Sequence, residues 1–141
     1  MIYLIGSLRN PQVPIVAAEM RTWGHDVFDD WYAAGPEADD KWQEYETQRK
    51  RNFTQALYSP HARTVFDFDT HWLKSSTAAV LVMPGGKSAH LELGWILGRG
   101  VSGYVLFDNP PDRYDIMYQF ATGVAMSMEE LKIMLDDDAV H

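Results

Sequence analysis

The chain has 141 residues, of which 46% are apolar and 23% charged, as in an ordinary globular domain. Its formal net charge of −8, without any basic run, argues against a protein that binds nucleic acid through the phosphates. There is no cysteine, no signal-peptide pattern and no apolar stretch of membrane-spanning length. We therefore expect one cytoplasmic domain, residues 1–141, with neither nucleic acid nor membrane as partner.

The first expected element is a strand at residues 1–5, because MIYLI is short, apolar and β-branched. We place this strand centrally in a parallel sheet. Pro11 and Pro14 suit the first turn of a helix, which Gly24 ends. Residues 25–29 are expected to form the second strand.

A loop at residues 30–39 is expected next, because it contains Gly-Pro. Residues 40–58 then have the pattern of the longest helix, with a charged face that we expect to be solvated. Ser59-Pro60 is interpreted as a break followed by a connection. We predict a helix at residues 69–74, and residues 65–67 form either a short strand or the approach to that helix.

The most informative stretch begins with a continuous apolar run at residues 78–83, typical of a buried parallel strand. Pro84-Gly85-Gly86 stops it. Ser88 is predicted to be the N-cap of a helix that ends at Gly98 or two residues later. This places Glu92 in the first turn, where the helix dipole favours the carboxylate as an anion.

The C-terminal part continues the alternation of strands and helices. The expected elements are a strand at 101–107, a loop at 108–111, a short helix at 114–121, a strand at 123–126, a helix opened by a capping box at 127–130, and a frayed tail at 136–138. The pattern predicts a single-domain α/β protein with a three-layer α/β/α architecture. Its sheet should be mostly parallel, have roughly five strands, and be flavodoxin- or Rossmann-like.

Glu92 is the candidate reactive residue, because an acid after a central strand faces the crevice in which α/β proteins bind ligands. A capping-box role fits poorly, since Glu92 stands four positions after Ser88 and a capping box needs three. A solvated helix glutamate is the alternative. Asp67 and Asp69 are also notable: a helix N-cap explains one of them and leaves the other unexplained. Trp31 either caps the core or stacks on a flat heterocycle.

Taken together, these residues resemble the nucleoside 2-deoxyribosyltransferase family and its relatives that hydrolyse nucleoside 5'-monophosphates. The resemblance covers most of the chain. It rests on five elements: YLIGSLR at residues 3–9, Asp69 three residues before Trp72, the strand at 79–83, LELG at 91–94 followed by Gly98, and YDIM at 114–117.

The resemblance implies a retaining displacement in which Glu92 attacks the anomeric carbon of a deoxyribonucleoside and the base leaves. A second base, or water, then takes the sugar from the glutamate. Tyr3 would hydrogen-bond and orient Glu92, and Asp69 would hold the sugar or assist the departing base. Gly94 would allow close helix packing under the ligand. A covalent glycosyl intermediate replaces one difficult displacement by two easier ones.

Other matching positions concern the substrate's 5' end. Gly6 and Ser7 would form the loop at the sheet crevice. Ser7 and Arg9 match positions with which the monophosphate hydrolases hold a phosphate, although Arg9 is alternatively an ordinary surface residue. Lys87 and Ser88, at a helix start, would add donors suited to an anion.

The chain also departs from the family pattern. Gly86 stands where better-known transferases carry an aspartate six residues before the nucleophile, so the group that protonates the base is unassigned. Asp115 stands in place of an asparagine in the segment through which a neighbouring subunit completes the site. His90 is either a general acid or, as we expect, a surface histidine.

From these residues we expect an enzyme that cleaves or exchanges the N-glycosidic bond of 2'-deoxynucleosides through Glu92, with no metal or organic cofactor. Its partners would be a nucleoside or nucleotide, a free base and further copies of the chain. One alternative is a nucleoside 5'-monophosphate N-glycosidase. Another is a nucleotide-binding module without activity, because fold does not fix function.

Overall fold

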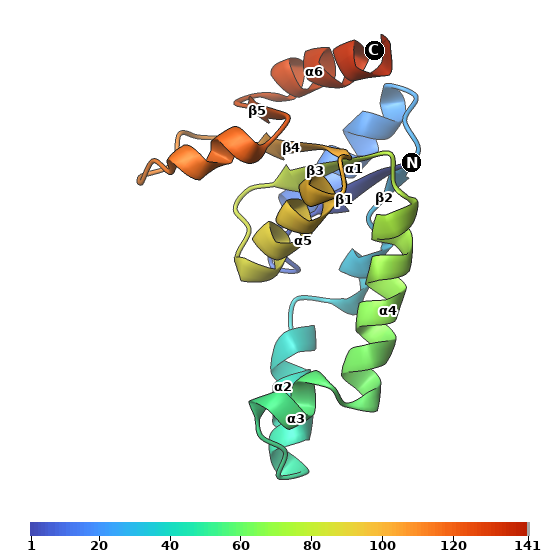
Figure 1. Cartoon of the computed structure of the whole chain (residues 1–141), viewed down its shortest axis with the longest axis vertical. Helices are drawn as coiled ribbons and strands as arrows, with labels where there is room; N and C mark the ends of the chain where they lie inside the picture. Colours follow the sequence, from blue (N-terminus) through green and yellow to red (C-terminus); the bar gives the residue numbers. More distant parts are fainter. Residues whose placement is uncertain (141) are drawn as a thin grey trace.

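A five-stranded sheet forms the centre of the computed structural model, which describes residues 1–140. The strands are β1 (Ile2–Ile5), β2 (Val27–Phe28), β3 (Ala78–Val82), β4 (Ser102–Leu106) and β5 (Gly123–Ala125). Their order is β2-β1-β3-β4-β5, and all four neighbouring pairs are parallel. This is the flavodoxin-like order, and helices flank the sheet (Figure 1). The predicted fold class is therefore confirmed.

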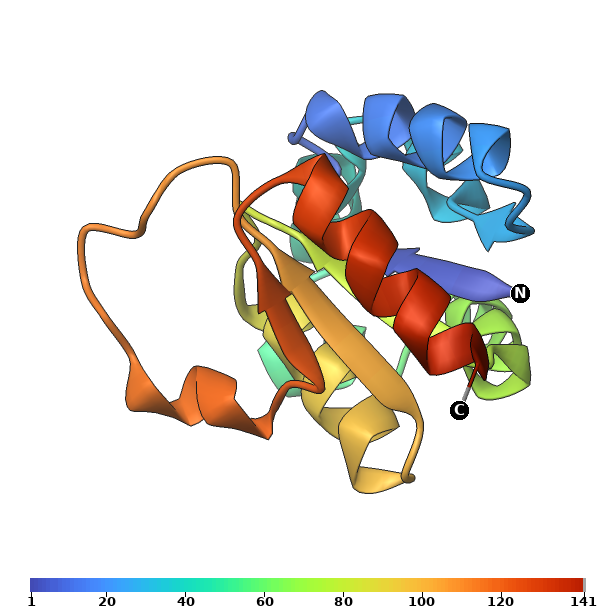
Figure 2. The same ribbon diagram turned by 90° about the horizontal axis from the view of Figure 1, so that it is seen from above.

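Two helical layers cover the sheet, because parallel strands must be buried on both faces. Helices α1 (Gln12–Thr22) and α6 (Met128–Val140) lie on one side, and α5 (Lys87–Gly98) lies on the other (Figure 2). Helix α4 (Pro60–Ser75) flanks the α5 side. Side chains alternate along β1, so Leu4 joins the core under α1 while Tyr3 joins the core under α5.

The region between β2 and β3 differs most from the expectation. The predicted loop at 30–39 contains a 3-10 helix, η1 (Asp30–Ala34), and the start of α2 (Ala38–Gln48). The single helix expected at 40–58 is wrong. It breaks at Lys50, whose φ is 57°, and restarts as α3 (Phe53–Leu57).

Local hydrogen bonds explain both helix starts in this region. Asn52 and Gln55 form a capping box, so the chain after Lys50 is set up to begin α3. Ser59-Pro60, interpreted as a break, is instead the start of α4: Ser59 caps it and Pro60 occupies the first turn. The connection expected after Pro60 and the strand alternative for residues 65–67 are therefore wrong, because one helix of 16 residues includes them together with the helix predicted at 69–74.

An arm, formed by α2, α3 and the N-terminal half of α4, extends beyond the sheet (Figure 1). Helix α4 has 16 residues, or roughly 24 Å at 1.5 Å per residue, and leads directly into the start of β3. Its N-terminal half extends away from the sheet on the side of α5 (Figure 1).

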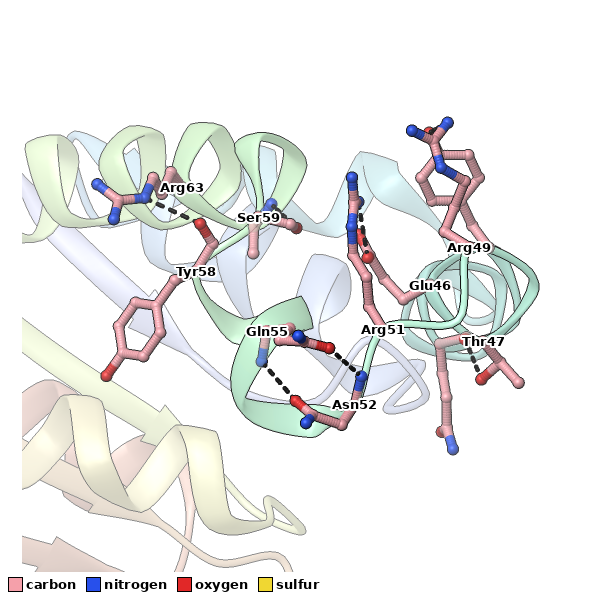
Figure 3. A network of polar contacts seen from close by, with 12 residues as sticks. Glu46, Thr47, Arg49, Arg51, Asn52, Gln55, Tyr58, Ser59 and Arg63 are labelled. Atoms are coloured by element: carbon pink, nitrogen blue, oxygen red, sulfur yellow. Dashed lines mark hydrogen bonds and ion pairs between the residues drawn. The ribbon is translucent and has the colours of Figure 1, made fainter.

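A buried ion pair stabilises the arm, so the charged face predicted to be solvated includes an exception. Glu46 is only 2% exposed, and its carboxylate accepts a hydrogen bond from Arg51 at 2.9 Å (Figure 3). Burial raises the pKa of Glu46, but its polar interactions, above all the hydrogen bond and charge of Arg51, outweigh this effect, so the net pKa is lowered. The pair joins the end of α2 to the turn before α3.

The C-terminal elements follow the expected order with two corrections. Residues 114–121 form a loop and a 3-10 helix, η2 (Ile116–Phe120). The capping box predicted at 127–130 is altered. Ser127 Oγ accepts a hydrogen bond from the Glu130 N–H at 3.1 Å, but the Glu130 carboxylate accepts from the N–H of Met126, one residue before the cap. The tail at 136–138 is part of α6, where Asp138 accepts a hydrogen bond from Ser102 at 3.0 Å, so the expectation of fraying is wrong. Among residues 1–140, no helix combines the length and apolar character that crossing a bilayer requires.

Candidate functional site

The candidate site lies at the carboxyl ends of β1 and β3, where the strand order reverses direction. Beyond β1 the chain passes to the β2 side, and beyond β3 it passes to the β4 side, which makes this the switch point of the sheet. The loops that follow these two strands form a cavity of about 230 Å³. Its lining residues are Ser7, Arg9, Asn10, Pro84, Gly85 and Gly86.

Three titratable side chains come together on the α5 side of the sheet: Tyr3 from β1, Asp69 from α4 and Glu92 from α5. Burial raises the pKa of Glu92 to about 8, and the charge of Asp69 contributes to the increase. Burial also raises the pKa of Asp69 to about 6. Tyr3 is 1% exposed, and burial together with both carboxylates raises its pKa above the ordinary value. The predicted catalytic residues therefore form one electrostatically coupled cluster.

The position of Glu92 on its helix corrects the sequence analysis. Helix α5 begins at Lys87, its N-cap is Gly86, and no side chain caps it, so the predicted N-cap at Ser88 is wrong. Glu92 is the sixth residue of α5 and lies in the second turn. The dipole was expected to favour its anion, but the helix dipole acts within the first turn, and burial has the opposite and larger effect.

Asp69 is not a helix cap, because both Asp67 and Asp69 lie inside α4 and Ser59 caps that helix. Asp67 is exposed, whereas Asp69 is partly buried. The capping explanation of either aspartate is therefore wrong. A partly buried carboxyl in the middle of a helix has no capping partner to stabilise it, which leaves its proximity to Glu92 as its distinctive property.

An aromatic stack holds α4 against the sheet beneath Asp69. Phe28 stacks on Tyr3 with ring centroids 5.3 Å apart and on Trp72 at 4.9 Å. The ring centroid of Phe68 lies 6.2 Å from that of Phe28, and the Phe68 side chain is 48% exposed. Phe28 and Phe68 were missed in the sequence, where they stand as single aromatic residues without a spacing that relates them to Glu92.

Trp31 packs under the crevice against both core clusters, as expected of a residue that caps the core. Its indole N–H donates to the carbonyl of Leu4 at 2.7 Å. A Cβ atom at Gly6 would lie 2.9 Å from Val13 Cγ2 and 3.6 Å from the Trp31 ring. Gly6 is therefore required by close packing at the end of β1.

Gly94 has a different environment from the one expected. It is exposed, and a Cβ atom placed there would meet nothing within 4 Å. The prediction that Gly94 permits close packing is therefore wrong. The close approach of α5 to the sheet occurs at Gly103 in β4, where a Cβ would lie 2.8 Å from Leu93 and 2.9 Å from Leu97.

Arg9 lies on the cavity but already has an anionic partner. Its guanidinium donates to the Asp40 carboxylate at 2.6 Å and to the Pro36 carbonyl at 3.3 Å. Ser7 Oγ accepts the backbone N–H of Arg9 at 3.1 Å, which orders the loop. Gly86 lines the same cavity, whereas Ser88 is exposed in the first turn of α5.

His90 and Asp115 belong to the opposite flank of α5. His90 hydrogen-bonds through Nδ1 to the Gly86 carbonyl at 2.7 Å and through Nε2 to the Tyr118 hydroxyl at 2.9 Å. Both ring nitrogens of His90 therefore have hydrogen-bond partners, one of which lies in η2. Asp115 caps η2 by accepting the Met117 N–H at 2.8 Å.

The described residues contain no group of three or more His, Asp and Glu side chains placed to hold a metal ion. No protein-family model matches the sequence, and no curated protein matches it. The features that bear on function are the Tyr3–Asp69–Glu92 cluster and the cavity at the carboxyl ends of β1 and β3, whose lining includes none of these three residues.

Proposed function

We propose that the chain cleaves the N-glycosidic bond of 2'-deoxynucleosides by a retaining mechanism and transfers the sugar to a second base. The observation that carries the proposal is the carboxyl pair Glu92–Asp69, whose pKa values of about 8 and about 6 differ strongly from ordinary ones. Perturbed acids at a crevice of this fold are candidates for chemistry. Their resemblance to a deoxyribosyltransferase site supports the choice of bond.

The pair supplies both a proton and a nucleophile. At a pH between the two pKa values the two carboxyl groups together hold one proton, which belongs to the pair and not to either residue alone. In the proposed first step that proton passes through Asp69 to a ring nitrogen of the base. The bond between the anomeric carbon and the base breaks, its electron pair leaves with the base, and the Glu92 carboxylate forms an ester to the same carbon.

The second step reverses these roles. A nitrogen of the acceptor base attacks the anomeric carbon, the ester bond to Glu92 breaks, and the acceptor returns its proton to the pair. When water replaces the acceptor, the product is free deoxyribose. A sugar without a 2'-hydroxyl reaches the oxocarbenium-like transition state more readily, which favours deoxyribonucleosides as substrates. The buried Tyr3 hydroxyl orients the Glu92 carboxylate.

A second candidate function is hydrolysis of nucleoside 5'-monophosphates. It is favoured by the cavity at the carboxyl ends of β1 and β3, because Arg9 and Ser7 line it and suit a phosphate. A monophosphate would place its anion there and its glycosidic bond near Glu92. The two functions differ in whether the phosphate is required and whether water replaces the second base.

We also propose that the chain self-associates and that a neighbouring copy completes the site through its η2 segment. Large apolar side chains are exposed on α3, α4, α5 and η2: Phe53, Leu57, Val65, Phe66, Leu91, Trp95, Ile116, Met117 and Phe120. Exposed apolar side chains of this size are found at protein interfaces. Around η2 it includes a hollow of about 330 Å³.

The test measures release of free base from deoxynucleosides and their 5'-monophosphates, each with and without an acceptor base. Glu92→Gln is the test variant, and Glu44→Gln on the exposed face of α2 is its matched control. A new nucleoside that forms only with acceptor supports the transferase. Release from monophosphates alone supports the hydrolase. No release, or equal release by Glu92→Gln, would contradict both and leave a binding module.

A further inference from the structure

The Arg9–Asp40 ion pair lies beside the proposed phosphate position. Asp40 belongs to the first turn of α2, and its carboxylate is 2.6 Å from Arg9 Nη2. Both side chains are well exposed, 65% and 68%, so solvent and salt reach the pair. Arg9 also donates to the Pro36 carbonyl, which ties the guanidinium to the segment that enters the arm.

The surroundings of Arg9 are acidic. Glu37 and Asp39 lie within three residues of Asp40, and the chain as a whole carries a net charge of −8. A 5'-phosphate that approached Arg9 would have to displace the Asp40 carboxylate and would meet its negative charge at short range. A nucleoside without a phosphate would meet neither obstacle, because its 5'-hydroxyl is neutral.

We propose that Asp40 is a specificity-determining residue that occupies the anion-binding face of Arg9 and thereby selects a nucleoside over its 5'-monophosphate. The inference rests on the proposed function, in which Arg9 faces the 5' end of the substrate. Asp40 thus distinguishes between the two candidate activities: its carboxylate opposes the hydrolase substrate and leaves the transferase substrate unaffected.

The expected effect is moderate. An exposed ion pair contributes little, so a phosphate can compete for Arg9, and removing the Asp40 charge should strengthen monophosphate binding by about fivefold. The gain should decrease as salt is added, because ions screen exposed charges. Nucleoside affinity should stay within about twofold of its starting value, since the neutral ligand does not compete with Asp40.

Isothermal titration tests this, with deoxynucleosides, their 5'-monophosphates and inorganic pyrophosphate as ligands in the Glu92→Gln background, which prevents turnover. The variants are Asp40→Asn, Arg9→Ala with Asp40→Asn, and Asp39→Asn. The last removes an equal charge from the same turn without breaking the Arg9 pair. We expect the gain with Asp40→Asn only, and its loss when Arg9 is also replaced.

Unchanged or weaker monophosphate binding by Asp40→Asn would overturn the proposal, since Asp40 would then be neutral or would orient Arg9 for the phosphate. An equal gain from Asp39→Asn would also overturn it. The pyrophosphate arm separates this inference from the proposed function. If no nucleoside binds but pyrophosphate binding depends on Arg9 and increases in Asp40→Asn, the proposed function fails, whereas the competition of Asp40 with an anion for Arg9 is supported. If pyrophosphate does not bind either, both fail.

Discussion

Glu92 and Asp69 come from different helices, and the charge on Asp69 raises the pKa of Glu92 beyond the effect of burial alone. The two acids therefore do not titrate independently. Because α4 and α5 are separated by β3 in the chain and meet only in the folded sheet, this coupling is a property of the tertiary structure. It determines how activity and stability should depend on pH.

Activity should follow a bell-shaped pH profile. The proposed chemistry requires one proton on the pair, so kcat/KM should rise near pH 6 and fall near pH 8, in line with the two pKa values. In Asp69→Asn the charge that opposes ionisation of Glu92 is gone, so the pKa of Glu92 should fall, and because Asp69 delivers the proton to the base, kcat/KM should decrease across the whole range. Initial rates from about pH 5 to 10 measure both limbs. A profile flat across that range would contradict the shared proton.

The contribution of Glu92 to stability should decrease as pH rises, whereas that of an ordinary paired carboxylate, whose pKa is lowered by folding, increases with pH. Its pKa is raised in the folded protein, from 4.5 to about 8, so the neutral form stabilises the fold below pH 4.5 and that contribution is lost as pH rises through 8. Since each pKa unit corresponds to about 1.4 kcal/mol, Glu92→Gln should stabilise the protein by roughly 2–4 kcal/mol near pH 9.

The same substitution should change little near pH 4, where Glu92 is neutral in both states. Urea unfolding at both pH values measures the difference, and the exposed Glu44→Gln should show no such trend. A gain that is equal at the two pH values would show that burial of the charge is not its cause.

Two glycine substitutions should have opposite effects on α5. Gly94→Ala adds a methyl group to open space within a helix, so it should stabilise the protein by about 0.5–1 kcal/mol. Gly103→Ala forces a Cβ to within 3 Å of Leu93 and Leu97 and should destabilise it by about 1–3 kcal/mol. Thermal unfolding of the two variants provides the comparison. Destabilisation by Gly94→Ala would show that this surface is covered.

Self-association should depend on η2. Light scattering should show the parent chain as a dimer or larger, and Ile116→Ser with Phe120→Ser should shift it toward the monomer and reduce base release together. Ile15→Ser is the matched control, because Ile15 is 56% exposed on α1, on the opposite side of the sheet. A monomeric parent chain would exclude the shared site but would not affect the proposed role of Glu92.

The sequence was most informative where local signals and tertiary structure agree. The apolar run at 78–83 correctly predicted β3, because buried parallel strands are continuous apolar runs. The glycines after it correctly predicted a turn followed by a helix, although its N-cap is Gly86 and not Ser88. The family resemblance grouped Tyr3, Asp69 and Glu92, whose charges interact in the folded structure. The fold class followed from the alternation of strands and helices.

The errors arise where one local pattern has two meanings or where the answer depends on burial. Ser-Pro ends one helix and begins another equally well, so α4 was not recognised as a single helix. The ionisation of Glu92 was argued from the helix dipole, a local effect, whereas its surroundings come from β1 and α4. The burial of Glu46 likewise depends on Arg51 after a turn that no apolar periodicity predicts.

The edges of the sheet limit how the chain can assemble. Its outer strands are β2, with two residues, and β5, with three, so each edge offers few unpaired backbone groups to a neighbouring strand. Growth of the sheet from one molecule into the next is therefore disfavoured, and the protein has a built-in resistance to edge-to-edge aggregation. We therefore expect ordered complexes to form through the exposed apolar side chains of helical segments such as η2, and not by joining one sheet to the next.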